Sequence, residues 1–391
     1  MAMFELQEVA QLVNIKVIGV GGAGCNAINN MIQHDLTGNL HGVQFIAANT
    51  DAQVLKNSQA SDVIQLGANL TRGFGAGCDP EIGRQAAEED RERIAEMIDG
   101  ANLLFITAGM GGGTGTGAAP VIAQVAQEKG IFTVGVVTKP GLDEGPRQKL
   151  AQAGIDELSL HVDSLIIVSN QKLEEVLGDD VTIDEAFRAA DDVLRDAVGS
   201  VVEIIYSSGV VNVDFADVMK VMKEKGMTIM GSAMATGEGR AVRAMEEAIS
   251  CPLLDNIRFD GARGVLVNFT ASRESLKRSE IRQALEMIND HVVDGAPVKH
   301  GVVYDPSMGD SIRVTVIATG LGNREAKPQL TMVQSEARKT GTDNAPVLNP
   351  EDYDTPAIWR SNRGRGGAAA PAAGSNTIDM DIPAFLRRQA D

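Results

Sequence analysis

Residues 103–117 read Leu-Leu-Phe-Ile-Thr-Ala-Gly-Met-Gly-Gly-Gly-Thr-Gly-Thr-Gly, and this stretch decides the fold class. Its start, Leu103–Thr107, is a run of apolar and β-branched residues that predicts a short buried strand. Residues 109–117 are rich in glycine, which costs conformational entropy on folding unless the backbone needs it. A helix is predicted over Pro120–Lys129. The stretch therefore predicts a strand, a glycine loop and a helix in succession.

The same succession occurs at the start of the chain. Ile15–Val20 is a predicted strand and Gly21–Asn30 leads into a helix. Between them, Gly19-Val-Gly-Gly-Ala-Gly24 fits the Gly-x-Gly-x-x-Gly pattern of dinucleotide-binding turns. Further strands are predicted over 43–48, 131–137 and 164–168, with a helix over 80–99 between two of them. Strands and helices that alternate in this way predict an α/β fold with a doubly wound parallel sheet.

Both glycine loops suit the binding of phosphate. Glycines let the backbone approach closely, and the free N–H groups at a helix start attract anionic oxygens. Thr114 and Thr116 add hydroxyl groups, and Gly73-Phe-Gly-Ala-Gly77 is a third glycine loop. No Lys follows residues 109–117, so the Walker phosphate loop is absent. The alternative is that the glycines only allow tight turns.

The rest of the chain divides by composition and periodicity. A 3.6-residue apolar period predicts one long connecting helix over 181–205, between a nucleotide-binding domain at 14–180 and a smaller α/β domain at 206–322. In the smaller domain, strands are predicted over 264–270 and 312–319, and helices over 241–250 and 279–291. Residues 1–13 form an N-terminal extension. Residues 323–376 are poor in apolar groups and are predicted to be a disordered linker.

Charge and composition exclude several classes of protein. The formal net charge is −18, and the nine basic and nine acidic residues after position 322 cancel, so residues 1–322 carry all of it. Such an acidic body argues against a nucleic-acid partner. No apolar run reaches the ~20 residues of a membrane span, and no signal sequence precedes residue 14, so a cytoplasmic location is expected. The three cysteines are too scattered to predict a disulfide or a metal site.

The glycine run 112–117, Gly-Gly-Thr-Gly-Thr-Gly, is similar to the signature of the tubulin/FtsZ family of GTPases. The resemblance covers residues 14–322 and includes the end of the chain, 379–388. It implies GTP and GDP as ligands, with Mg²⁺ held mainly through the nucleotide and no metal site of the protein's own. The nucleotide-binding residues that it implies are Gly21, Gly22, Ala23, Gly24, Cys25, Asn26, Asn49, Asp51, Ala76, Gly77, Gly111, Gly112, Gly113, Thr114, Gly115, Thr116, Gly117, Glu144, Arg147, Asn170, Phe187 and Asp191.

Phe187 and Asp191 match the base-recognition pair of the family, and their spacing of four places both on one face of a helix. The Asp191 carboxylate would accept hydrogen bonds from two guanine N–H groups. Without the resemblance, Phe187 is better interpreted as a core aromatic residue.

Asn212, Asp214 and Asp217 match the family's catalytic residues, which reach the nucleotide of the neighbouring subunit. Their role would be to orient a water molecule against the γ-phosphate, with a cation moderating the charge of the two acids. The alternative is a helix N-cap with solvated acids.

The resemblance implies a GTPase that assembles head to tail into filaments at the mid-cell division site, with hydrolysis completed between subunits. Such a heterologous contact propagates instead of closing. One alternative is a nicotinamide-dependent oxidoreductase with Asp51 as the ribose acid, which leaves 109–117 unexplained. Another is a nucleotide-regulated scaffold without significant turnover.

Residues 377–391 form a predicted partner-binding peptide, because apolar groups return there beside two arginines. Division proteins and membrane tethers are the expected partners, without direct membrane insertion. A frayed tail is the alternative. The predicted contact residues are Asp379, Asp381, Ile382, Pro383, Phe385, Leu386, Arg387 and Arg388.

Overall fold

The computed structural model divides the chain into two units, residues 1–325 and 326–391, and every described residue lies in the first. The described residues are 13–34, 42–141, 144–178, 181–206, 213–224, 226–250, 259, 261–289, 291–293 and 295–321. The predicted linker and terminal peptide, residues 1–12 of the predicted N-terminal extension 1–13, and Asn212 lie outside them.

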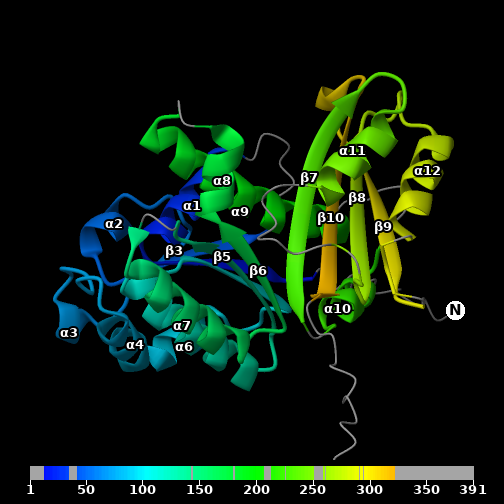
Figure 1. Ribbon diagram of the computed structural model, residues 1–391. Coiled ribbons are helices and arrows are strands. Elements are labelled where there is room, and N and C mark those ends of the chain that lie inside the picture. Colours follow the sequence, from blue (N-terminus) through cyan, green and yellow to red (C-terminus); the bar gives the residue numbers. More distant parts are fainter. Residues whose placement is uncertain are drawn as a thin grey trace, which may run out of the picture. The chain divides into compact units, whose positions relative to one another are not determined.

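Six parallel strands form the first part of the sheet (Figure 1). Their spatial order is β3 (Asp62–Gln65), β2 (Gln44–Asn49), β1 (Ile15–Val20), β4 (Leu103–Gly109), β5 (Phe132–Lys139) and β6 (Ser164–Ser169). The chain moves outward from β1 in one direction and then from β4 in the other. This order is that of a doubly wound nucleotide-binding sheet, so the predicted fold class is confirmed.

Alternating side chains of β1 show why both faces of this sheet are covered. Ile15 and Val17 belong to one apolar cluster, whereas Ile18 and Val20 belong to another. Successive side chains of a strand point to opposite faces, so each cluster fills one face. All six residues of β1 are buried. A strand buried on both sides needs helices on both sides.

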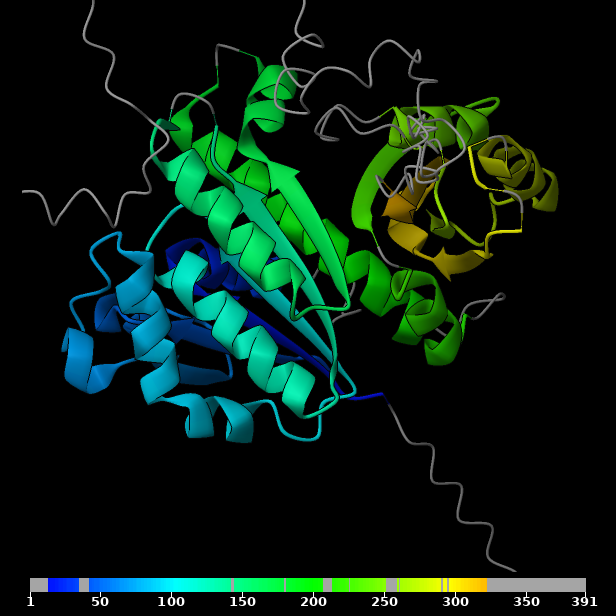
Figure 2. The ribbon, with the colours of Figure 1, turned by 60° about the horizontal axis from the view of Figure 1, so that its bottom comes forward.

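Helices supply both layers. The first cluster is closed by α1 (Gly21–Gln33), α8 (Asn170–Leu177) and α9 (Ile183–Tyr206). The second is closed by α4 (Pro80–Glu89), α5 (Arg91–Met97), α6 (Thr114–Glu128) and α7 (Arg147–Ser159). Figure 2 shows α6 and α7 side by side on their face of the sheet. Two short helices, α2 (Ala52–Lys56) and α3 (Ala68–Thr71), complete this half.

The second half contains a mixed four-stranded sheet. Strand β10 (Ser311–Leu321) lies antiparallel between β7 (Met227–Thr236) and β8 (Gly264–Ala271), and β9 (Val298–Tyr304) pairs in parallel with β8. The helices of this half are α10 (Phe215–Met222), α11 (Arg240–Ile249) and α12 (Arg278–Asn289), and a 3₁₀ turn lies at Pro306–Met308. Alternate residues of β8 and β10 pack with α11 and α12 in a third apolar cluster.

Helix α9 joins the two halves through buried contacts. Its Glu203 carboxylate accepts a hydrogen bond from Asn268 Nδ2 at 3.1 Å and pairs with Arg313 at 3.4 Å. Strand β7 follows β6 in the sheet, where Ile166 pairs with Thr228. The long helix is therefore packed along its length, in keeping with a predicted connector. The domain boundaries at 14–180 and 206–322 stay predictions.

Several element predictions were wrong. Strands β3, β7 and β9 were not predicted, and the predicted helix 80–99 is two helices separated at Asp90. The predicted helix at Pro120 in fact begins at Thr114, so that Pro120 lies inside it. Proline is favoured in a first turn, but here the helix starts within the glycine run because closely packed neighbours hold those residues in helical conformation.

Candidate functional site

The predicted nucleotide-binding segments follow the carboxyl ends of parallel strands. Gly21 follows β1, Asp51 follows β2, the loop from Met110 follows β4, Glu144 follows β5 and Asn170 follows β6. Parallel strands end at the same edge, and ligands of such sheets bind where the strand order reverses. The order reverses between β1 and β4. The two main glycine loops therefore flank the point where a ligand is expected.

Helix α1 begins at an uncapped end. Its N-cap residue Val20 makes no side-chain hydrogen bond, and Gly21 has a φ of +76°, which disfavours other residues. Gly22, Ala23 and Asn26 are exposed. A side chain at Gly22 would meet nothing within 4 Å. The N–H groups of this first turn suit an anion.

Helix α6 begins in the same way beside it. Its N-cap Gly113 provides no side chain, and Gly111 has a φ of +94°. A Cβ at Gly112 would meet nothing within 4 Å. Thr116 is buried, and its Oγ1 accepts a hydrogen bond from Gly111 N at 2.8 Å, so this hydroxyl holds the loop in place. Thr114 Oγ1 lies 2.6 Å from Thr50 Oγ1.

Other glycines in the two loops are required by packing. A Cβ at Gly24 would lie 2.4 Å from Thr107 O, and one at Gly115 would lie 2.5 Å from Gly109 O. One at Gly117 would lie 1.9 Å from Pro80 O. Real Cβ contacts this short do not occur. Close packing, and not contact with a ligand, therefore explains these three glycines, whereas the open space at Gly22 and Gly112 favours a ligand.

The third glycine loop, 72–78, packs against the second. Arg72, Cys78 and its three glycines all have positive φ. Ala76 is buried, and a Cβ at Gly113 would approach Ala76 Cβ to 2.9 Å. At Gly77 an added Cβ would meet nothing within 4 Å. The loop thus places Ala76 and Gly77, two of the predicted nucleotide-binding residues, beside the start of α6.

Asn49 ends β2, Thr50 and Asp51 follow it, and all three are held by one another and by neighbouring loops. Asn49 Oδ1 accepts a hydrogen bond from Asp51 N at 3.1 Å, and the Asp51 carboxylate caps α2. Thr71 Oγ1 donates to Thr50 O at 3.2 Å. Thr50 was not predicted, although its place between two predicted residues could have drawn attention to it.

Cys25, another predicted nucleotide-binding residue, is buried. Burial raises the pKa of the Cys25 thiol to about 11, so it stays protonated.

Glu144 and Arg147 form an ion pair with each other at the other side of the glycine loops. Arg147 Nε also donates to Gly111 O at 3.3 Å, and Glu144 Oε1 accepts from Gly141 N at 3.2 Å. Arg147 thus contacts the second glycine loop directly. Asn170 is the first residue of α8, and its buried Oδ1 has no hydrogen-bond partner among the described residues. An orphaned acceptor suits a ligand that donates a hydrogen bond.

Phe187 and Asp191 lie on α9. Phe187 is 61% exposed, so the alternative of a core aromatic residue is wrong. Asp191 is half-buried, and its side chain makes no hydrogen bond or ion pair within the described part of the chain. Burial, together with the neighbouring Asp192 carboxylate, raises the pKa of Asp191 to about 7. A desolvated carboxylate next to an exposed ring fits a flat base with N–H donors.

The predicted acids stand at α10. Asp214 is its N-cap, and its Oδ1 accepts from Asp217 N at 2.7 Å, which is the capping role given as the alternative. Asp217 Oδ1 lies 2.9 Å from Lys299 Nζ of β9. Lys299 could not be predicted, because only the fold brings β9 to α10. Within the described residues, no three His, Cys, Asp or Glu side chains gather to hold a metal ion.

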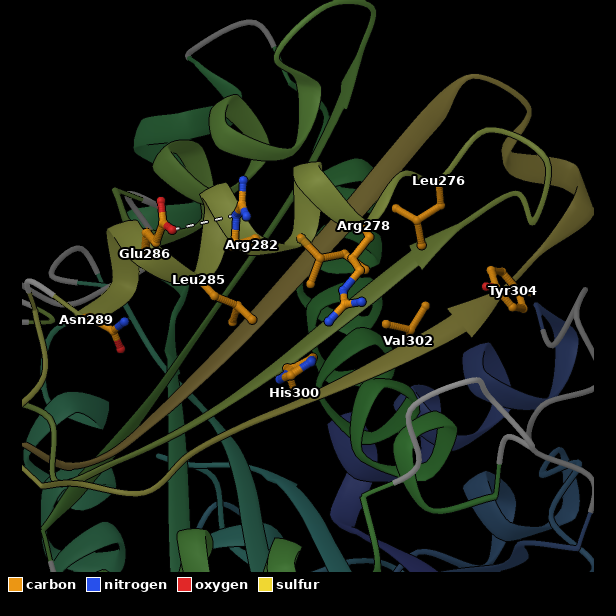
Figure 3. Close-up of a pocket in the computed structure, with 10 residues that line it drawn as sticks. Leu276, Arg278, Arg282, Leu285, Glu286, Asn289, His300, Val302 and Tyr304 are labelled. Atoms are coloured by element: carbon orange, nitrogen blue, oxygen red, sulfur yellow. Dashed lines mark ion pairs between the residues drawn. The ribbon is translucent and has the colours of Figure 1, made fainter.

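A cavity of about 770 Å³ lies in the second half of the chain, between α12 and β9 (Figure 3). His300, Val302 and Tyr304 point into it from β9, and Arg282 pairs with Glu286 at 3.8 Å on α12. None of the predicted site residues that the structure describes lines it.

No helix in the described ranges is long and apolar enough to cross a membrane.

Two family models match the chain. The tubulin/FtsZ family GTPase domain matches residues 14–178, and the FtsZ family C-terminal domain matches residues 226–322. The cell division protein FtsZ of Neisseria meningitidis serogroup A is 50% identical over 381 residues, which cover 96% of this chain and 95% of that protein. The FtsZ of Pseudomonas aeruginosa is 49% identical, and the match covers 100% of both chains.

A solved structure of an FtsZ dimer from M. jannaschii has a TM-score of 0.74 and 38% identity to this chain, covering 79% of it and 88% of the solved chain. The nicotinamide-dependent oxidoreductase and the scaffold without turnover find no support in these matches, since the matched nucleotide domain is a GTPase domain. This chain therefore belongs to the FtsZ family of tubulin-like GTPases, the polymerising GTPases of cell division.

Proposed function

We propose that this GTPase binds GTP at the reversal point of its parallel sheet and hydrolyses it only where two subunits meet. The phosphates lie over the uncapped starts of α1 and α6, next to Gly22 and Gly112. The base stacks on Phe187 and hydrogen-bonds to Asp191. Asn212, Asp214 and Asp217 of the next subunit orient the water that attacks the γ-phosphorus, and GDP and phosphate leave.

The length of α9 carries this proposal. The helix has 24 residues, with Asp191 in its first half, and Asp214 and Asp217 come after its end. At 1.5 Å per residue, Asp191 and the end of α9 are about 22 Å apart. Helix α10, which bears the acids, packs on β8 and β9 rather than on the glycine loops. This separation along a packed helix favours two half-sites that combine between copies of the chain.

Mg²⁺ fits this site through the nucleotide. It prefers phosphate oxygens and water to a cage made of protein groups alone. Asp51 stands beside the glycine loops, but its carboxylate already caps α2. Bound Mg²⁺ would neutralise charge on the phosphates, while the chain's own N–H groups hold their oxygens.

Turnover per subunit is expected to rise with protein concentration above a threshold, because the two half-sites meet only in a filament. Phosphate release across a dilution series, with sedimentation of the same samples, measures this. The threshold for turnover should coincide with the threshold for pelleted polymer. A rate per subunit that stays constant on dilution would mean that one chain holds the complete site.

Asp191→Ala is expected to weaken GTP binding by about 1.5 to 3 kcal/mol, the range for hydrogen bonds to a charged group. Discrimination against ATP should fall as well, because adenine does not offer the same two donors. Equal losses for GTP and ATP would show that Asp191 does not recognise the base.

The raised pKa of Asp191 predicts a pH dependence of the same contact. The guanine donors bind the carboxylate form, so the nucleotide lowers this pKa below its value of about 7 in the free protein. Affinity should be full above pH 7 and fall as the pH drops through 7, with proton release on binding. Calorimetry at pH 6 and pH 8 measures this. Asp191→Asn is the control, because it retains the titration of the phosphates and loses that of Asp191.

Residues 377–391 are proposed to bind division proteins and membrane tethers, so that filaments gather at mid-cell in the cytoplasm. Deleting 379–391 should leave GTPase activity and polymers intact and abolish recruitment to vesicles that carry a tether protein. Co-sedimentation with such vesicles measures recruitment. Loss of polymerisation in the shortened chain would contradict this division of roles.

A further inference from the structure

Strand β9 presents different side chains to the two helices that lie on its opposite faces, α12 and α10. His300, Val302 and Tyr304 face the cavity under α12 (Figure 3). Lys299 alternates with them and so points to the opposite face. There its Nζ lies 2.9 Å from Asp217 Oδ1 on α10. The strand thereby delivers one cation to one of the two proposed catalytic acids.

Asp217 is fixed at two points. Its backbone N–H donates to Asp214 Oδ1 at 2.7 Å, which sets the start of α10. Its carboxylate is held through Oδ1 by Lys299. The two acids and the lysine therefore form one connected group. In it, Asp214 binds the backbone N–H of Asp217, and Lys299 orients the Asp217 side chain.

Stability gives little reason for this ion pair. The side chains of Lys299 and Asp217 are 37% and 33% exposed. Pairs with this much solvent contribute only about 0 to 1 kcal/mol to folding. Its electrostatic effect at a subunit contact is different, because two carboxylates that approach a triphosphate are repelled. Adding Lys299 reduces the formal charge of the group from about −2 to about −1.

We propose that Lys299 is a positioning residue for GTP hydrolysis and acts through Asp217. This inference rests on the proposed hydrolysis between subunits. It holds the carboxylate in one orientation toward the neighbour's γ-phosphate and moderates the repulsion between the acids and the triphosphate. The lysine itself binds no nucleotide of its own subunit.

The test compares three variants of the full chain. Lys299→Met removes the charge, Lys299→Arg retains it, and Lys129→Met is the matched control. Lys129 pairs with Asp99 at 2.6 Å and is similarly exposed, on a face that carries no proposed site residue. Turnover is measured over a range of GTP concentrations and divided by the amount of pelleted polymer, so that weaker assembly does not pass for slower chemistry.

In Lys299→Met, kcat should fall about tenfold, between the small effect of an exposed ion pair and the ~100-fold loss of a misplaced catalytic group. The KM for GTP and the binding of GTP to the subunit should not change. Lys299→Arg should recover at least a third of wild-type kcat, and Lys129→Met should stay within twofold of it.

Two results would separate the possible failures. If wild-type turnover does not depend on protein concentration, then hydrolysis between subunits is wrong and the role of Lys299 falls with it. If wild-type turnover does depend on concentration while Lys299→Met matches Lys129→Met, then only the inference about Lys299 is overturned. A loss in Lys299→Met that Lys299→Arg does not restore would also overturn it.

Discussion

A mixture of Asp217→Ala and Thr114→Arg chains is expected to hydrolyse GTP well above the sum of the two proteins measured alone. Asp217→Ala retains a good pocket and presents an inactive acid loop. Thr114→Arg obstructs the start of α6 and leaves Asp214 and Asp217 unchanged. Each protein alone should lose about a hundredfold in turnover or more, as when one group that stabilises the transition state is removed.

The mixture should recover because a junction can combine the intact half of each protein. In a random equal copolymer, roughly a quarter of the head-to-tail contacts place an intact loop over an intact pocket. Phosphate release should therefore reach roughly a quarter of the wild-type rate. Sedimentation with one labelled variant must first show that the two chains copolymerise. Copolymers without recovered turnover would show that the catalytic site is not shared between subunits. Asp214 would then be only a helix cap.

Gly117→Ala is expected to destabilise the chain by about 3 kcal/mol, the upper part of the usual range for an overpacked site. The added Cβ would stand 1.9 Å from Pro80 O, so α4 and α6 must separate. Gly117 and the Pro80 carbonyl both belong to the backbone of packed helices, so neither can move aside without loss of packing. Urea unfolding of the nucleotide-free protein, followed by circular dichroism, measures the loss.

Gly112→Ala is the matched variant, since its Cβ would enter open space. Stability should change by about 0.5 kcal/mol or less, as for other exposed sites. Nucleotide affinity should fall, because the methyl group occupies space proposed for phosphate. If Gly112→Ala binds GTP like the wild type, the open space at this glycine is not the phosphate site. If Gly117→Ala is as stable as the wild type, the close packing of α4 on α6 is wrong.

Much of the fold could be predicted from the sequence because it is encoded locally. Strands β1 and β4 are short, mostly apolar runs that lead into glycine loops, and the long helix α9 has a clear apolar period. The strands that were missed lack such patterns. β3 has four residues at one edge of the sheet, β9 carries Lys299 and His300 near its start at the other edge, and β7 is rich in Met, Thr and Ala. Their partners in the sheet stabilise these strands, and a single sequence does not show those partners.

The sequence by itself determined the class of sheet, the two phosphate-type glycine loops and, by resemblance, the family. Only the tertiary structure decided which glycines are packed, as at Gly117, and which leave open space, as at Gly112. It also decided that Phe187 is exposed and that Lys299 meets Asp217. The physical reason is that a turn or an apolar period depends on neighbouring residues, whereas space, desolvation and charge pairing depend on groups that the fold brings from distant elements.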